Sequence, residues 1–165
     1  MVVSFNELPD HSRLWVYQAD RNLTDDEQEE LRPVLYTFLD QWAAHGKALS
    51  AAGDFAFNRF IVIAVNEDVH GASGCSIDSS VNFIKELGNK LNINFFDRTK
   101  VLYLDNNDLI NSKTIGEIKK SVSEGSLQPT TKIFNTAVTS KKDFDEAFVI
   151  SIKDSWLNKW LPSTV

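Results

Sequence analysis

The sequence has a single cysteine, no long apolar run and no excess of positive charge, and each absence narrows the class of protein. Cys75 has no second cysteine to pair with, so an internal disulfide is excluded. No apolar run approaches the roughly 20 residues that cross a bilayer. The net charge of −6 disfavours a binder of nucleic-acid backbones and a polybasic membrane anchor, because both depend on Lys and Arg.

Targeting signals and linkers are also missing from the sequence. The first seven residues carry neither a charged n-region nor a continuous apolar h-region, so we expect no secretory signal and a cytoplasmic location. The chain shows no low-complexity linker, no charge block and no internal repeat. Hydrophobic residues make up 42% of it, which is enough for a core. We therefore expect one domain over residues 1–165.

Short runs rich in β-formers predict four strands in the first two thirds of the chain. They comprise residues 14–18, 47–57, 59–65 and 101–104. Two amphipathic helices lie between them in sequence, so the order of elements is β-α-β-β-α-β. This order predicts an α+β fold with a ferredoxin-like core of two helices on one antiparallel sheet. The core would span about residues 12–105, with a C-terminal α/β extension at about 106–165 packed on it.

Both predicted helices have recognisable features. Thr24 and Glu27 form a capping box ahead of the first helix, which we expect to end at Gly46. Pro33 lies inside this helix and predicts a kink or a restart near residues 29–33. The apolar stripe of the second helix is predicted to consist of Ile77, Val81, Ile84, Leu87 and Leu91.

The stretch from His70 to Ser80 joins the strongest strand to the second helix and is the most unusual in the chain. The first amides of a helix have no partner within it, so this end can hold an anion. We therefore expect an anion or small-ligand site here. Its predicted residues are Gly74, Ser76, Asp78, Ser79 and Ser80, with Tyr17 and Arg21 from the end of the first strand. The alternative is a helix start whose serines only satisfy its own amides.

Cys75 lies near the start of the same helix, where the helix dipole favours a thiolate. A nucleophilic cysteine needs a base, and the candidates are His70 and His45, which we expect at the end of the first helix. Neither spacing requires contact with the sulphur, and small buried cysteines are more common than catalytic ones. The leading hypothesis is therefore a non-catalytic small-ligand-binding or regulatory module. A cysteine-dependent hydrolase or transferase is the alternative.

Four segments together carry a family resemblance: residues 15–18, 21–24, 42–47 and 72–80. They are similar to a small bacterial family whose members are usually labelled "ABC transporter ATPase". The resemblance covers most of the chain, and the Gly-Cys-Ser-Ile-Asp-Ser-Ser stretch is its most specific part. It implies membership of a group and supplies no mechanism.

The phosphate-binding loop of an ABC-type ATPase is nevertheless missing. Such a loop reads Gly-x-x-x-x-Gly-Lys-Ser/Thr and comes before a helix. The nearest stretch, Gly46-Lys47-Ala48, follows Gln41 in place of glycine and has alanine in place of the hydroxyl residue. We therefore expect no ATPase of this type. The histidines and the cysteine also lack zinc-ligand spacing, so no metal or other cofactor is expected.

Trp156 and Trp160 stand four residues apart near the C-terminus. At helical spacing they predict a buried pair, and the alternative is an anchor for a partner. The expected partner is an unidentified small molecule or protein rather than nucleic acid or a membrane. Association of the chain with itself through an exposed sheet edge is a third hypothesis.

Overall fold

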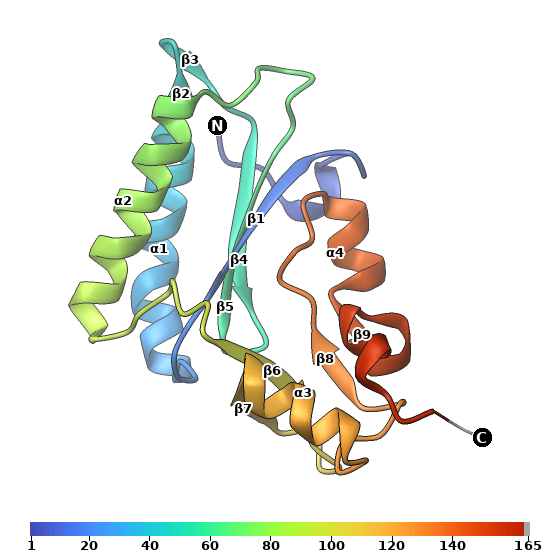
Figure 1. Ribbon diagram of the computed structural model, residues 1–165. Coiled ribbons are helices and arrows are strands. Elements are labelled where there is room, and N and C mark those ends of the chain that lie inside the picture. The colour runs from blue at the N-terminus through green and yellow to red at the C-terminus, as the bar shows by residue number, and fades with distance from the viewer. Residues whose placement is uncertain (164–165) are drawn as a thin grey trace. The chain divides into compact units, whose positions relative to one another are not determined.

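The computed structural model describes residues 1–163, and the chain divides into two compact units (Figure 1). Unit 1 consists of residues 1–97 and 137–145, and unit 2 consists of residues 98–136 and 146–165. Helices and antiparallel sheets occur together, which confirms the α+β class. The boundary falls after Asp97 rather than near residue 105. The expectation of one domain stays a prediction.

Unit 1 is built on a three-stranded antiparallel sheet of order β1-β5-β4. Its strands are β1 (Arg13–Gln18), β4 (Ala51–Ala56) and β5 (Phe60–Val65). Every residue of β5, the strongest apolar run, is buried, and the strand lies between β1 and β4. The strands β4 and β5 form a hairpin, because they are antiparallel neighbours that pair across the turn near Asn58.

The fourth predicted strand, β6 (Lys100–Leu104), does not join this sheet. It pairs with β7 (Ile110–Thr114) and β8 (Lys132–Phe134) in a separate sheet of unit 2, so the prediction that it joins the sheet of unit 1 is wrong. Among residues 1–163, only isolated bridges meet this edge of β1, from Gln18 to Phe96 and from Arg13 to Ser140. Side-chain alternation marks a strand and its buried face, but it does not name the partner strand.

Two helices of unit 1, α1 (Asp25–Gln41) and α2 (Gly74–Leu91), lie side by side (Figure 1). The capping box is confirmed: Glu27 N donates to Thr24 Oγ1 at 3.1 Å, and Thr24 N donates to Glu27 Oε1 at 2.9 Å. The helix α1 continues through Pro33, so the predicted restart is wrong. A proline removes a single amide donor, here the one that would reach the carbonyl of Glu29, an exposed residue.

Gly46 closes a turn rather than a helix. The helix α1 ends at Gln41, and a small hairpin follows, formed by β2 (Ala43–Ala44) and β3 (Lys47–Ala48). Its two turn residues, His45 and Gly46, have φ angles of 52° and 77°. Two-residue hairpin turns with both residues at positive φ match the twist of the flanking strands. His45 is therefore a turn residue, and its predicted place at the end of a helix is wrong.

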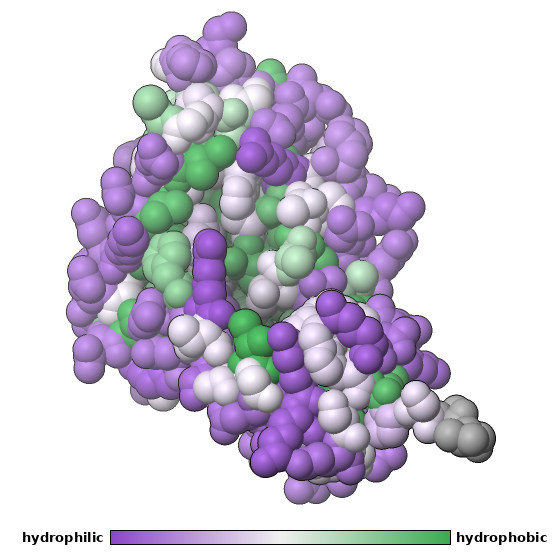
Figure 2. Space-filling view, in the orientation of Figure 1, coloured by the Kyte–Doolittle hydropathy of each residue, from purple (hydrophilic) through white to green (hydrophobic). Residues whose placement is uncertain are grey.

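The core of unit 1 fills the space between the sheet and the two helices. It includes Leu31, Leu35 and Leu39 of α1, Ile84 and Leu87 of α2, and Ile61, Ile63 and Val65 of β5. Between the helices, Phe38 and Phe83 stack with ring centroids 4.1 Å apart. Hydrophilic side chains cover most of the molecular face in Figure 2, in keeping with 24% charged residues.

The predicted stripe of α2 is only partly confirmed. Ile84 and Leu87 are buried, whereas Ile77, Val81 and Leu91 are only partly buried. Ser76 and Ser80 are the fully buried residues in the first two turns of the helix. The buried face is thus rotated toward these two serines, which an apolar pattern cannot reveal.

Unit 2 contains a four-stranded antiparallel sheet of order β7-β6-β8-β9. Its further strands and helix are β7 (Ile110–Thr114), α3 (Ile115–Ser123), β8 (Lys132–Phe134) and β9 (Val149–Ser151). The helix α4 (Lys141–Ala147) begins in unit 1 and ends in unit 2. Short 3-10 helices cover Phe5–Glu7, Ile152–Asp154 and Trp156–Trp160. Within residues 1–163, none of the helices has the length and apolarity that a bilayer crossing requires.

The predicted burial of the tryptophan pair is half right. Leu157, between them in sequence, is fully buried in the core of unit 2, and Trp160 packs against that core. Trp156, however, remains 44% exposed and meets Trp160 edge to face, with ring centroids 5.7 Å apart. The two residues lie on a 3-10 helix, where a spacing of three, not four, places side chains above one another.

Candidate functional site

The predicted anion site lies at the start of α2, where the helix caps itself. Ser73 is the N-cap: its Oγ accepts the amide of Ser76 at 3.1 Å, and Ser76 Oγ accepts the amide of Ser73 at 2.8 Å. The Ser76 hydroxyl donates in turn to the Ser73 carbonyl at 2.8 Å. These bonds match the alternative hypothesis, in which the serines satisfy the helix's own groups.

Two amides at this end remain available. Gly74 and Cys75 are exposed, and their amides donate no hydrogen bond within the part of the chain that the structure describes. They are the first two of α2, where anions bind to helices. The carboxylate of Glu67, however, accepts the amide of the neighbouring Ala72 at 3.0 Å and places a negative charge beside this end. The anion site therefore stays a prediction, with two open amides for it and one carboxylate against it.

The other predicted ligand residues of α2 fall into an exposed pair and a buried residue. Asp78 and Ser79 are exposed. Ser80 is buried, and its hydroxyl donates to the Ile77 carbonyl at 2.7 Å. Tyr17 is buried as well, with its hydroxyl 3.5 Å from Ser80 Oγ. The structure thus brings Tyr17 and Ser80 together in the interior and not at the helix tip.

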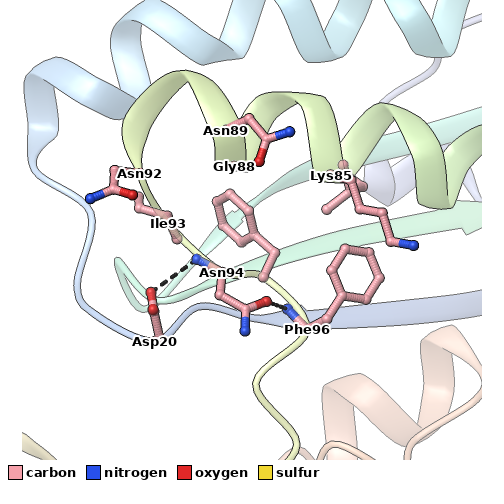
Figure 3. A pocket seen from close by; sticks show the side chains of 10 residues that line it. Asp20, Lys85, Gly88, Asn89, Asn92, Ile93, Asn94 and Phe96 are labelled. Atoms are coloured by element: carbon pink, nitrogen blue, oxygen red, sulfur yellow. Dashed lines mark hydrogen bonds between the residues drawn. The ribbon is translucent and has the colours of Figure 1, made fainter.

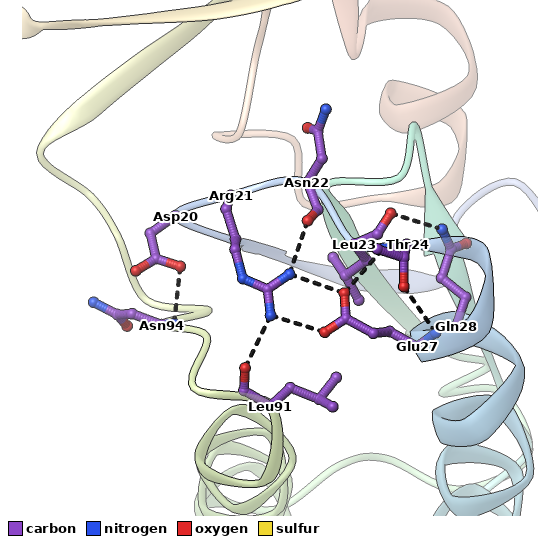
Figure 4. A network of polar contacts seen from close by, with 9 residues as sticks. All are labelled: Asp20, Arg21, Asn22, Leu23, Thr24, Glu27, Gln28, Leu91 and Asn94. Atoms are coloured by element: carbon purple, nitrogen blue, oxygen red, sulfur yellow. Dashed lines mark hydrogen bonds and ion pairs between the residues drawn. The ribbon is translucent and has the colours of Figure 1, made fainter.

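Arg21 lies at the opposite end of α2 from Ser76. Its Nη1 and Nη2 each donate to a carboxylate oxygen of Glu27 at 2.8 Å, and they also donate to the carbonyls of Asn22 and Leu91 (Figure 4). The pKa of Glu27 is lowered to about 2. The hydrogen bond from Arg21 contributes most to this shift, and the hydrogen bond from the Thr24 amide contributes next. Arg21 therefore ties the start of α1 to the last turn of α2 and contributes nothing to the predicted anion site.

No hydrogen bond joins Cys75 to an imidazole among residues 1–163. Cys75 is exposed and free, and its sulphur makes no hydrogen bond among residues 1–163. His70 Nε2 lies 2.9 Å from the carbonyl of Ala44 and must donate to it, because a carbonyl only accepts. His45 is exposed in the β2–β3 turn. The three residues thus form no hydrogen-bonded nucleophile and base.

A pocket that the sequence did not predict lies at the C-terminal end of α2 (Figure 3). Its volume is about 400 Å³, within the range of roughly 300–1,000 Å³ typical of ligand sites. The polar and aromatic residues around it are Asp20, Lys85, Asn89, Asn92, Asn94, Phe95 and Phe96. All belong to unit 1.

Close approach of the backbone shapes this pocket. Asn92 ends α2 in the left-handed conformation, with φ 53° and ψ 47°, and the amides of Asn92 and Ile93 both reach the Gly88 carbonyl. The chain then folds back so tightly that a Cβ at Gly88 would overlap the carbonyl oxygen of Ile93. Asparagine after the last apolar residue is a helix-stop signal, and it was the one clue to this turn in the sequence.

The pocket wall is fixed by two short hydrogen bonds. Asp20 Oδ1 accepts the amide of Asn94 at 3.1 Å, and Asn94 Oδ1 accepts the amide of Phe96 at 2.9 Å (Figure 3). The amide groups of Asn89 and Asn92 and the NH₂ of Asn94 make no hydrogen bond among the described residues, and all three residues are exposed. Around one cavity the chain therefore presents three carboxamides with unused donors beside a carboxylate.

In the part of the chain that the structure describes, no three His, Cys, Asp or Glu side chains gather in a group that could hold a metal ion.

Comparison with known proteins leaves the family open. No protein-family model matches this chain, and searches of curated proteins and of solved structures return no significant match. The family resemblance of residues 15–18, 21–24, 42–47 and 72–80 therefore stays a prediction.

Proposed function

We propose that this protein is a non-catalytic binding module whose ligand site is the pocket at the C-terminal end of α2. One observation carries the proposal: Asn89, Asn92 and Asn94 surround one cavity, with amide donors that no described residue uses. These three residues are exposed, so their amides bond water until a ligand replaces it, and a few polar groups at the rim of a cavity can fix the orientation of a ligand.

The absence of a paired nucleophile and base supports the non-catalytic part of the proposal. A cysteine nucleophile needs an imidazole within hydrogen-bond reach or poised to reach it. Cys75 has no hydrogen-bond partner in residues 1–163, and His70 is engaged by Ala44. None of these residues lines the pocket. A cysteine-dependent hydrolase or transferase is therefore the weaker candidate.

An anion site at residues 71–80 is the second candidate within the binding class. The exposed, unbonded amides of Gly74 and Cys75 favour it. The carboxylates of Glu67, bonded to the Ala72 amide, and of Asp78, in the first turns of the helix, weaken it through repulsion. The pocket has more unused donors and a defined volume, so we place it first.

The arrangement of unit 1 belongs to the same proposal. We take it as a variant of the ferredoxin-like fold in which β1, β5 and β4 supply three strands of the sheet. The bridges from Phe96 and Ser140 lie where the fourth strand would pair. A cytoplasmic location, a small molecule or protein as partner, self-association and the relation to the small bacterial family remain parts of this proposal.

A library of small metabolites titrated into ¹⁵N-labelled protein tests the proposed function. We expect at least one compound to shift the backbone signals of residues 84–96 and the side-chain NH₂ signals of Asn89, Asn92 and Asn94 in a saturable way. Shifts confined to residues 71–80 would favour the anion site instead. A library that perturbs neither set of signals would refute the proposal.

A further inference from the structure

We infer that the pocket at the C-terminal end of α2 binds a neutral polyhydroxylated molecule, namely a carbohydrate of one or two sugar rings. This inference rests on the proposed function of the same pocket, and it adds the chemical class of the ligand. Three features carry it: the balance of charge around the cavity, the type of unused hydrogen-bonding group, and the state of its aromatic rings.

The charges around the cavity nearly cancel. The lining contains one carboxylate, Asp20, and one ammonium, Lys85. An anion would meet Asp20 and the carbonyl end of the helix dipole, and a cation would meet Lys85. A neutral ligand avoids both repulsions.

The unused polar groups match hydroxyls. A carboxamide offers two N–H donors and a carbonyl acceptor side by side, and a hydroxyl can donate and accept at the same time. Adjacent hydroxyls of a sugar can therefore bond one carboxamide at both of its ends. Asn89 and Asn92 are free to do so, and the NH₂ of Asn94 is free to donate, while the backbone amide of Asn94 donates to one oxygen of Asp20. The carboxylate can then accept a third hydroxyl through its second oxygen.

The rings of the pocket do not suit a flat aromatic ligand. Phe95 is only 1% exposed. Phe96 already meets the ring of Tyr17 at an interplanar angle of 68°, and the Lys85 ammonium lies 5.6 Å from its centroid. Neither ring is open on both sides, whereas a nucleobase is held best between stacked faces. Aliphatic C–H groups of a sugar need only the limited ring surface that Phe96 leaves.

The test is a titration of the ¹⁵N-labelled full chain with three kinds of probe. These are neutral compounds (D-glucose, D-galactose, D-mannose, maltose and myo-inositol), a cation (putrescine) and an anion (inorganic phosphate). We expect at least one neutral probe to saturate the signals of residues 84–96. Saturation by putrescine or phosphate alone would overturn the inference that the ligand is a carbohydrate and would leave the proposed function in place. No response to any probe also overturns the inference, and the metabolite library then decides whether the proposed function fails with it.

Two variants and a matched control link the signal to the pocket. Asn89→Ala removes one carboxamide that makes no hydrogen bond among the described residues. It should lower the affinity for the sugar by roughly two- to tenfold, which corresponds to the loss of one hydrogen bond. Asn82→Ala changes the same residue type in the same helix, exposed and outside the lining, and should leave the affinity unchanged. Asp20→Asn keeps an acceptor for the Asn94 amide and should change sugar affinity by less than about tenfold. An equal loss of sugar affinity in Asn89→Ala and Asn82→Ala would overturn the inference that the sugar binds in this pocket.

Discussion

The two ends of α2 are both polar, yet they use their polar groups differently. At the N-terminal end, Ser73 and Ser76 satisfy each other's amides, and the indole Nε1 of Trp42 donates to the Ser76 carbonyl at 2.9 Å. At the C-terminal end, Asn89 and Asn92 leave their amide groups unused around a cavity. The two ends thus differ in what their polar groups bond, which is why the pocket and not the helix start is our first candidate for a site.

Burial explains most of this difference. Ser76 and Ser80 are 3% and 2% exposed, and a buried hydroxyl without a partner would cost about 1–3 kcal/mol. The helix start must therefore use its serines internally. The asparagines at the other end are exposed, so water can satisfy them until a ligand replaces it. The serines at the helix start stabilise the fold, and the asparagines at the other end remain free to bind a ligand.

Replacing Gly88 with alanine should have the largest effect, because it disrupts the turn at the C-terminal end of α2. The added Cβ would overlap the carbonyl oxygen of Ile93, a backbone atom that cannot rotate away. We expect a loss of about 3 kcal/mol in the free energy of unfolding, measured by urea denaturation. Gly74→Ala is the matched control at the other end, where a Cβ meets nothing within 4 Å, and it should be neutral or stabilise by up to about 1 kcal/mol. Equal stability of the two variants would contradict the close approach at Gly88.

Glu27→Gln sharpens the role of Arg21, which holds the last turn of α2. The folded-state pKa of Glu27 is about 2, below its ordinary value of 4.5, so the ion pair stabilises the protein above pH 4.5. This stabilisation is lost as the pH falls from 4.5 toward 2. We expect the variant to be less stable by about 1 kcal/mol at pH 7, because the Arg21 side chain is 43% exposed and solvent screens the pair. Urea denaturation at pH 7 and pH 2.5 measures the difference.

The outcome at low pH separates charge from packing. The gap between the native protein and Glu27→Gln should narrow at pH 2.5, where the carboxylate is partly protonated. A gap of the same size at both pH values would mean that the ion pair is not its cause. Glu30→Gln, an exposed change in the same helix, should alter stability by less than about 0.5 kcal/mol at pH 7.

Ser73→Ala tests how far the N-terminal end depends on its own cap. The variant loses the acceptor for the Ser76 amide, and we expect it to be less stable by about 1 kcal/mol in thermal or urea unfolding. Ser79→Ala, an exposed change one turn and a half along the same helix, serves as the control and should be neutral. If Ser73→Ala is neutral too, the helix start is not stabilised by its capping box, and its amides are open to other partners.

Local features of the fold could be predicted from the sequence, because their causes lie within a few residues. Thr24 and Glu27 are three residues apart, and their side chains meet each other's backbone. The central strand β5 follows from its continuous apolar run. The sheet that holds β6 could not be predicted, since pairing is decided by distant strands. Gly46 was misassigned because a glycine at positive φ can end a helix or close a hairpin.

The candidate site was harder to predict for the same reason. Arg21 donates to Leu91, a residue 70 positions away, and no pattern in the sequence links the two. The pocket depends on Asp20 meeting Asn94, 74 positions away, which requires the fold to be known. What the sequence did contain was three asparagines in and just after the last turn of α2, at positions Asn89, Asn92 and Asn94. The Gly-Cys-Ser-Ile-Asp-Ser-Ser stretch was the stronger pattern, and its first serine, Ser76, belongs to the capping box that Ser73 opens.

Cys75→Ser should have the smallest effect of all. The side chain is exposed and has no hydrogen-bond partner among residues 1–163, so its replacement should change the free energy of unfolding by less than about 0.5 kcal/mol. Serine is nearly the same size but a much weaker nucleophile, so any activity that requires the thiolate would vanish. Binding at the far end of α2 should be unaffected, measured by the same ¹⁵N titration. A weaker affinity in this variant would mean that the two ends of the helix are energetically coupled, and the contrast between the capped end and the proposed binding end would no longer hold.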